Sequence, residues 1–274
     1  MFKVPGDLNL KTGNLDFVGS IEINGNVPSG FHLKADGDIK ILGMVEGAEI
    51  IAGGSVYVGE GVSGLGKAVI QAGLDIRVGY INQAAIEAGQ NLFVENSILH
   101  SHCVAKDSIY CQKGNIIGGT LSAGVRIEAK DIGNRMSTPT GLYLGVNKKV
   151  EEKVKKFTQL KNQKLEEKSK LHKLGEMLIN KINQGENRIK DKITLLRQKN
   201  SLSSVEEEIE DLTSTLSAMD AVMGEVQGAS VEVSGTLFAN TNLGFGRYQY
   251  KVMETKQKVI AILEEGEIVI HQKP

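Results

Sequence analysis

Hydrophobic and polar residues alternate in short runs through the first half of the chain. The run from Asp38 to Ile41 alternates in this way, and similar runs follow at Met44 and at Glu49. This pattern predicts β-strands of about four residues, each with one buried face. Glycines between the runs predict tight corners, where positive φ or close backbone approach is needed.

A five-residue box, Ala-x-x-x-[Ile/Val/Leu], recurs through the same region. The spacings between boxes are 17, 20, 16, 17 and 18 residues, too short for an array of helical hairpins. Three short strands and three turns in each period predict a mainly β fold, a single-stranded triangular β-solenoid. Because regular hexapeptide triplets are missing, a right-handed coil is favoured. The boxes begin at Ala35, Ala52, Ala72, Ala88, Ala105 and Ala123.

The same alternation extends upstream, at Leu15 with Phe17 and at Ile21 with Ile23. The solenoid is therefore expected to begin near the first residue and to run to about Leu144, in seven or eight coils. Each coil covers the apolar face of the next, so the predicted core is a continuous column of aliphatic side chains. We assign residues 1–146 to this domain.

The composition changes at Asn147, where glycine becomes rare and Lys, Glu, Leu and Gln take over. Residues 147–223 are predicted to form an inserted antiparallel coiled-coil hairpin. Its second arm carries apolar residues at alternating spacings of four and three, namely Val205, Ile209, Leu212, Leu216, Met219 and Met223.

Charge also favours an antiparallel pair of arms. Residues 148–183 hold 11 Lys and 5 Glu, whereas residues 204–223 hold 6 acids and no base. We expect the break between the arms near Gln184 and Gly185, a second weak point at 200–203, and a capping box formed by Ser204 with Glu207. A solvated helix face is the simplest explanation of the lysines, and nucleic-acid binding is a minor alternative.

Glycine and alternation return after Met223. Val231, Val233 and Leu237 have the pattern of another solenoid coil. Strands near 248–252 and 267–270 are predicted to cover the unpaired strand edges at this end. Residues 224–274 are therefore assigned to a segment that completes and caps the solenoid.

Composition narrows the function classes. The formal net charge of -1 gives no general attraction to nucleic acid, and no apolar run approaches the roughly 20 residues that a membrane helix needs. The two cysteines are too few for a disulfide scaffold and fit a reducing compartment. We expect a cytoplasmic protein with no membrane insertion and no nucleic-acid partner.

The stretch GEGVSGLGKA at 59–68 contains G-x-G-x-x-G and most of a P-loop pattern ending at Lys67. Such loops bind phosphate only between a strand and a helix. Here the next segment is β-patterned, and Ala68 stands where a P-loop has its hydroxyl. We therefore interpret the stretch as a solenoid corner with about three extra residues and predict no nucleotide cofactor.

One cluster could support chemistry. His100, His102 and Cys103, with Cys111 eight residues on, are reminiscent of the zinc or acyltransferase sites of other β-helices. Alternation predicts His100 and His102 on one face and Cys103 on the other, which suits two ligands but not three. The simpler interpretation, which we favour, is that the cysteines fill the core and the histidines lie at the surface, with no catalytic, metal or cofactor site.

Several segments are typical of one family. They are GNLDFVGSIEINGNVPSGF (13–31), the corner GVSGLGKA, SILHSHCVA (97–105), IGNRMSTPTGLYLGV (132–146) and EEGEIVI (264–270). With the late helical insertion, they resemble the flagellar assembly protein A family of bacteria over nearly the whole chain. The resemblance implies a role in flagellar assembly or cell organisation and supplies no catalytic residue. Members commonly have a further N-terminal domain.

Two function classes follow. In the first, the protein is a non-enzymatic scaffold or adaptor whose solenoid and helical arm bind other proteins or a second copy. In the second, it is a metal-binding or acyltransferase-type enzyme with a site near His100 and His102. End-to-end polymerisation, as in the similar bactofilin solenoids, is opposed by the predicted C-terminal cap.

Overall fold

The structure is a computed structural model that describes residues 1–145, 148–183, 189–223, 226 and 228–273. The chain forms two units. One contains residues 1–148 and 223–274, and the other contains residues 149–222. The first unit is a mainly β structure, and the second is a pair of helices.

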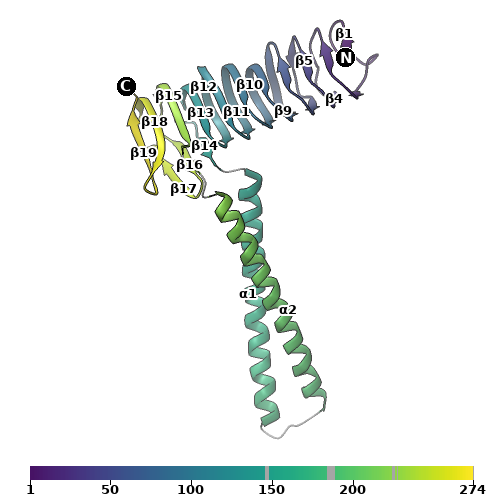
Figure 1. The fold of residues 1–274 in the computed structure, drawn as a ribbon, viewed down its shortest axis with the longest axis vertical. Coiled ribbons are helices and arrows are strands. Elements are labelled where there is room, and N and C mark those ends of the chain that lie inside the picture. Colours follow the sequence, from purple (N-terminus) through teal and green to yellow (C-terminus); the bar gives the residue numbers. More distant parts are fainter. Residues whose placement is uncertain (146–147, 184–188, 224–225, 227, 274) are drawn as a thin grey trace. The chain divides into compact units, whose positions relative to one another are not determined.

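The first unit is a β-solenoid of about eight coils, which confirms the predicted fold class. Figure 1 shows the strands stacked in chain order from the N-terminus to the C-terminus. The strands that pair in parallel are β1 (Phe2–Val4), β2 (Leu15–Phe17), β3 (Ile21–Ile23), β4 (His32–Ala35), β5 (Ile39–Ile41), β6 (Met44–Val45), β7 (Glu49–Ala52), β8 (Val56–Val58), β9 (Gly61–Ala72), β10 (Ile76–Ala88), β11 (Leu92–Ala105), β12 (Ser108–Ala123), β13 (Arg126–Ile132), β14 (Thr140–Leu144), β15 (Ser230–Leu237) and β16 (Thr241–Phe245).

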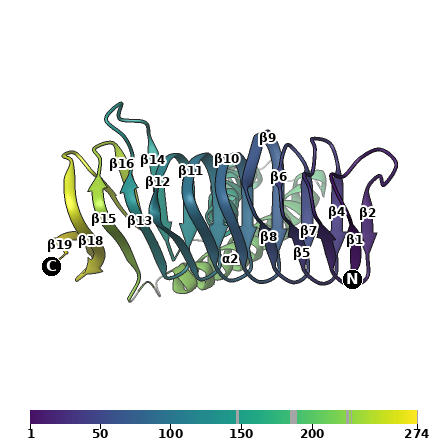
Figure 2. The same cartoon turned by 90° about the horizontal axis from the view of Figure 1, so that it is seen from above.

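Three faces make up each coil. The first face begins with β1, β3, β5 and β8, the second contains β6, and the third contains β2, β4 and β7. The strands β9, β10, β11 and β12 are longer, with 12 to 16 residues each. Each of them continues through a corner from one face to the next, and the register with the neighbouring strand shifts at a corner. Successive coils lie side by side in Figure 2.

On the second face, one row of buried side chains runs through eight coils. Ile81, for example, pairs with Val62 on one side and with Ile98 on the other. All members are completely buried, so each coil covers the apolar face of the next, as predicted. The row consists of Val27, Val45, Val62, Ile81, Ile98, Ile116, Ile132 and Leu237.

The first residues of the repeated boxes lie on the third face and stack directly on one another. They are Ala35, Ala52, Ala72, Ala88, Ala105 and Ala123. Phe17 precedes this row and Leu144 follows it. The repeated box in the sequence therefore corresponds to one stacked row at the ends of the third-face strands.

Side chains at the corners hydrogen-bond to the backbone of the next coil. Asp38 Oδ1 accepts from Ser55 N at 2.7 Å, and Asp75 Oδ1 accepts from Asn91 N at 3.0 Å. Asn26 Oδ1 accepts from Met44 N at 2.8 Å. These short polar side chains satisfy backbone N–H groups where the chain turns, so they hold neighbouring coils in register.

The predicted C-terminal strands are also present. β17 (Tyr248–Lys251) pairs antiparallel with β16, β18 (Lys256–Glu264) pairs antiparallel with β15, and β19 (Glu267–Gln272) pairs with β18. The parallel edges of β15 and β16 are therefore covered by strands that run in the opposite direction.

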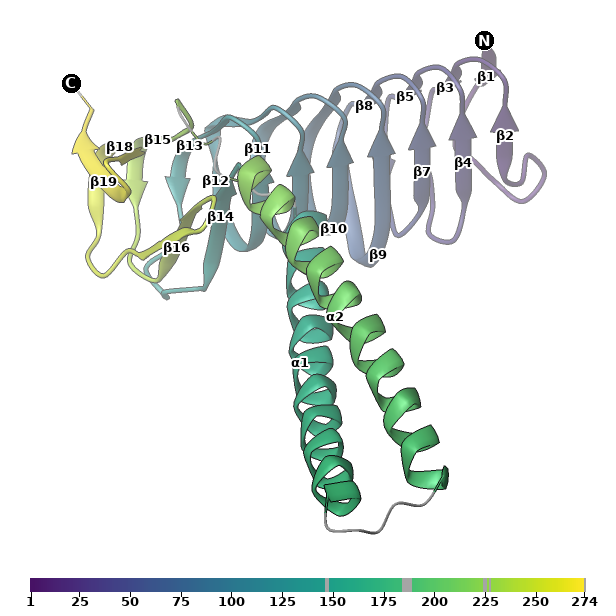
Figure 3. The ribbon, with the colours of Figure 1, turned by 60° about the horizontal axis from the view of Figure 1, so that its bottom comes forward.

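The second unit consists of α1 (Lys148–Asn183) and α2 (Ile189–Met223), which lie side by side in Figure 3. Ion pairs join Lys164 Nζ to Glu208 Oε2 at 2.8 Å and Lys168 Nζ to Glu206 Oε1 at 2.9 Å. Because the residue number rises in one helix as it falls in the other, the pairing is antiparallel. Coiled-coil packing and the right hand of the solenoid stay predictions.

Two expectations about helix boundaries are wrong. α2 is continuous through residues 200–203, so no weak point occurs there, and Ser204 with Glu207 lies inside the helix and forms no N-terminal cap. The apolar pattern that begins at Val205 suggested that the helix begins there. In the structure Leu195, Gln198 and Leu202 continue the same inner stripe toward the N-terminus, so α2 begins earlier. The break expected at Gln184 and Gly185 lies outside the described residues.

Candidate functional site

The GEGVSGLGKA stretch continues into a strand. Ser63 pairs with Asn82 and Ala68 pairs with Ala84, so four residues of β9 lie opposite the single residue Gln83 of β10. Three residues are therefore extra, as predicted for a widened corner. Lys67 is exposed, Ala68 is buried, and no helix N-terminus follows to bind a phosphate.

The structure places His100 at a corner of the solenoid and His102 on its third face. His100 has φ +47° and forms the corner between the Ser97–Leu99 part of β11 and the Ser101–Ala105 part. Burial still alternates from His100 to Cys103, so both histidines lie outside the core and Cys103 lies inside it, as predicted, although the chain turns at His100. Both rings are exposed, and His102 Nδ1 lies 2.6 Å from Thr120 Oγ1 on the next coil.

Cys103 and Cys111 point into the core. Cys103 is stacked between Ile86 and Leu121, and both thiols are free and buried. Burial raises the pKa of both thiols, that of Cys111 to about 12. A thiol with such a pKa stays protonated at neutral pH and is a poor nucleophile or metal ligand.

Ser101, between the two histidines, is a feature that pattern reasoning missed. Its side chain is fully buried, its Oγ accepts from Ala84 N at 3.2 Å, and the hydroxyl donates to Leu99 O at 2.6 Å. Thr140 lies in the same corner row two coils later and accepts from Gly118 N at 2.9 Å. These hydroxyls are structural, because both their donor and acceptor capacities serve the backbone.

Across the part of the chain that the structure describes, no three His, Cys, Asp or Glu side chains are gathered as metal ligands. The polar cluster around Arg126 is instead a set of compensated charges. Arg126 contacts Glu128 at 3.2 Å and Glu232 at 3.5 Å, and Lys273 Nζ pairs with Glu232 at 2.5 Å. The hydrogen bond to Glu128 raises the pKa of Arg126 above its usual value. This cluster therefore joins β13 to β15 and to the C-terminal segment.

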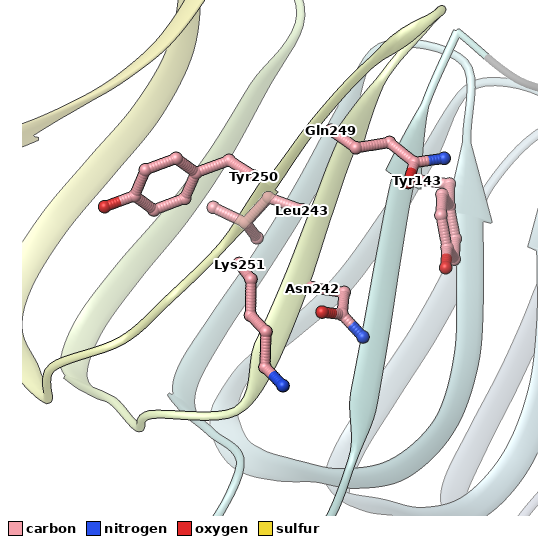
Figure 4. Close-up of a pocket in the computed structure, with 6 residues that line it drawn as sticks. All are labelled: Tyr143, Asn242, Leu243, Gln249, Tyr250 and Lys251. Atoms are coloured by element: carbon pink, nitrogen blue, oxygen red, sulfur yellow. The ribbon is translucent and has the colours of Figure 1, made fainter.

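A pocket of about 330 Å³ lies near the C-terminal end of the third face. It forms where the antiparallel β17 is added to β16, because Asn242 then pairs with Lys251 and Gly244 pairs with Gln249. Figure 4 shows the side chains from β14, β16 and β17 around it. Its lining residues are Tyr143, Asn242, Leu243, Gln249, Tyr250 and Lys251.

Two glycines make room for the ring of Tyr143 at this pocket. A Cβ at Gly244 would lie 2.5 Å from Tyr143 Cδ1, and a Cβ at Gly141 would lie 2.9 Å from Tyr143 Cε2. In Figure 4 the ring of Tyr250 points away from Tyr143. The lining offers amides, phenols and one ammonium group, which can hydrogen-bond to a polar ligand.

A row of rings and charges crosses the outside of the first face. The guanidinium carbon of Arg77 lies 4.7 Å from the centroid of the Phe93 ring, and Phe93 stacks on Tyr110 with centroids 5.2 Å apart. These three residues are paired in the parallel register of β10, β11 and β12. The row follows the coil repeat, so it stabilises neighbouring coils and gives the outer surface a regular spacing.

Fold and surface together define a β-solenoid protein with a pair of antiparallel helices inserted between its coils. The chain matches the family described as Flagellar Assembly Protein A beta solenoid domain over residues 1–268. The protein belongs to this family, and the resemblance inferred from its sequence segments is confirmed. No curated protein and no solved structure matches the chain.

Neither of the two helices, over the residues described for them, is long and apolar enough to cross a membrane.

Proposed function

We propose that the protein is a non-enzymatic scaffold or adaptor in bacterial flagellar assembly or cell organisation. The observation that carries this proposal is the continuous stack of parallel strands through about eight coils, with aliphatic rows filling the core. Such a structure is stiff and repeats its outer surface at each coil, which suits it to hold partners at fixed positions. Family membership supports the flagellar context.

The inserted helices are the second element of the proposal. They present a long surface of polar and apolar side chains that a partner protein, or a second copy of the chain, can bind. The antiparallel strands β17 to β19 oppose end-to-end polymerisation at the C-terminal end. We also propose that the protein acts in the cytoplasm, where its two cysteines remain reduced.

The enzyme alternative concerns His100 and His102. His100 lies at a corner where the chain turns, and the Nδ1 of His102 on the third face is already in contact with Thr120, which argues against a shared metal. A zinc-binding assay with His100→Ala and His102→Ala variants separates the two classes. Stoichiometric zinc that is lost in the variants would favour the enzyme class.

The scaffold proposal is tested by removing the helices. Gly145 and Val226 are close together, since a Cβ at Gly145 would lie 2.8 Å from Val226 Cγ2. A short linker can therefore replace residues 147–223 while the flanking strands keep their places. The whole protein and this deletion variant are used as baits in lysate of the native bacterium, and captured proteins are identified by mass spectrometry.

We expect one or more flagellar or cell-organisation proteins to be retained by the whole protein and lost or reduced with the deletion variant. Far-UV circular dichroism checks that the deletion variant keeps its β signal. If both baits capture the same proteins in equal amounts, the helices are not the binding element. If neither bait captures any such protein, the scaffold role is wrong.

A further inference from the structure

Helix α2 carries a second apolar stripe on the side away from α1. Its inner stripe contains the buried Gln198 and Val205, which face the other helix. The second stripe consists of Ile189, Ile193 and Leu196, which are 79%, 48% and 62% exposed. Their spacing of four and three residues places them on one face, roughly opposite the inner stripe at 100° per residue.

Basic residues border this outer stripe on both sides. Lys190 and Arg197 are seven residues apart along one border, and Lys192 and Lys199 are seven residues apart along the other. All four are exposed, and among the described side chains none of them is in an ion pair. An apolar stripe between two rows of cations is typical of helices that bind at an anionic interface.

The two halves of the helix pair differ in net charge. In the half where the helices meet the 184–188 segment, residues 171–183 and 189–199 together hold six Lys or Arg and two Asp or Glu. In the other half, lysines of α1 are paired with glutamates of α2, as at Lys164 with Glu208 and Lys168 with Glu206. Among the described side chains of the first half, no ion pair joins the two helices, so its positive charge is available to an external anion.

We propose that the outer stripe of α2, Ile189, Ile193 and Leu196 with its four bordering cations, binds the surface of an anionic phospholipid bilayer. The helix would lie along the interface, with its aliphatic side chains among the acyl chains and its cations at the headgroups. This mode needs no membrane-spanning helix. It concerns a lipid surface and does not rest on the scaffold role.

Charge and area favour a bilayer over the other occupants. A second copy would bring two positively charged stripes together, which is unfavourable. A groove on another protein is a poorer fit because a stable interface buries about 800 Å² on each partner, more than three side chains over two helical turns can offer. A bilayer has no such minimum area, and each cation near anionic lipid adds to the binding separately.

The first test is vesicle flotation with the full chain. Vesicles of phosphatidylcholine containing phosphatidylglycerol are compared with vesicles of phosphatidylcholine alone, at low and high salt. We expect binding to the anionic vesicles at low salt, weaker binding at high salt, and at least about tenfold weaker binding to the neutral vesicles. Absence of binding to the anionic vesicles, or equal binding to both kinds, would overturn the proposal.

Matched variants separate the stripe from general adsorption. The stripe variant combines Ile193→Gln with Leu196→Gln, and its control combines Leu160→Gln with Leu165→Gln, which are 40% and 43% exposed on α1. We expect the stripe variant to lose about tenfold in vesicle binding and the control to change less than about twofold. Equal losses in the two variants would contradict a specific stripe.

The cations are tested in the same way. The cation variant replaces Lys190, Lys192, Arg197 and Lys199 with Gln, and its control replaces Lys153, Lys156, Lys161 and Lys170, so both variants lose four positive charges. The cation variant should lose most of its binding, and its control should keep more. Equal binding by the two variants would show that only net charge matters and would overturn the proposed site.

A spectroscopic reporter tests insertion independently of affinity. The chain contains no Trp, so Ile193→Trp and Leu160→Trp each introduce a single fluorophore. We expect anionic vesicles to shift the emission of the Trp at position 193 to shorter wavelength and to leave that of the Trp at 160 unchanged. No shift at 193, or equal shifts at both positions, would overturn the placement of the stripe in the bilayer. Helical circular dichroism confirms that each variant is folded.

Discussion

Lys168 of α1 and Glu206 of α2 form an ion pair across the two helices, with 2.9 Å between Nζ and Oε1. The hydrogen bond from Lys168 lowers the pKa of Glu206 below its usual value of 4.5. Both side chains remain partly exposed, so the pair contributes modestly and is weakened by salt. It also helps to select the register in which the acidic part of α2 meets the basic part of α1.

This pair predicts a pH dependence for the helices. Because the folded-state pKa of Glu206 is lowered, its contribution to stability is complete above the unfolded-state pKa and is lost as pH falls through the lower folded value. The melting temperature of the helical dichroism signal should be higher in the wild type than in Glu206→Gln at neutral pH. The difference should shrink as the pH falls below 4.5 and disappear once the pH is below the lowered folded-state pKa of Glu206.

The control for this experiment is Glu207→Gln, which removes the same charge from an adjacent exposed residue with no ion pair among the described side chains. It should leave the melting temperature at neutral pH close to that of the wild type. A difference between Glu206→Gln and the wild type that persists unchanged to low pH would show that the ion pair is not the cause.

Gly114 is expected to tolerate no side chain. A Cβ at this position would overlap the carbonyl oxygen of Asn96 on the preceding coil and would lie 2.9 Å from Cys111 Sγ. We predict that Gly114→Ala lowers the free energy of unfolding by about 1–3 kcal/mol, measured by urea denaturation. Gly6→Ala is the control, since its Cβ would meet no atom within 4 Å. Equal stability of the two variants would contradict the close approach of the coils.

Leu121 tests the aliphatic column. It is fully buried on the third face, where it is stacked between Cys103 and Leu142. Leu121→Ala should reduce the free energy of unfolding by about 2–5 kcal/mol, because it removes transfer energy and leaves a cavity. Leu10→Ala makes the same chemical change at a side chain that is 93% exposed and should have little effect. Similar urea midpoints for the two variants would be inconsistent with this core.

The two cysteines are predicted to react slowly in the folded protein. Burial raises the pKa of Cys111 to about 12 and that of Cys103 further, so neither forms a thiolate near neutral pH, and neither is reached by solvent. A chromogenic disulfide reagent should therefore label both thiols quickly in denaturant and slowly in buffer. Rapid labelling in buffer would show that the solenoid opens readily at the coils that contain β11 and β12.

Much of the solenoid could be predicted from local pattern. The boxes from Ala35 to Ala123 stack in register, and the three extra residues before Ala68 lie at a corner, as their spacing indicated. Both predictions succeed because each coil buries its apolar side chains in the same way. Residues that recur at one position of the sequence repeat therefore stack in one row of the core.

The predictions failed or were silent where a residue's environment comes from another part of the chain. Alternation predicted both histidines on the outer side, and both are exposed, but it could not show that the chain turns at His100 with positive φ, because that corner contains no glycine. The pocket at Tyr143 was missed because its other walls come from β16 and β17, about a hundred residues later. The role of Ser101 was not predicted, because its hydroxyl bonds to the backbone of the preceding coil as well as of its own.

By its own periodicity the chain establishes a β-solenoid interrupted by helices, because short alternating strands in repeated units can bury their apolar side chains only against one another. Which apolar side chains of the helices stay exposed is decided by packing. Val205 is buried by contact with α1, whereas Ile193 and Leu196 on the same helix stay in solvent. A helix can turn only one face toward a single neighbour, so the second stripe of α2 remains at the surface once α1 is in place.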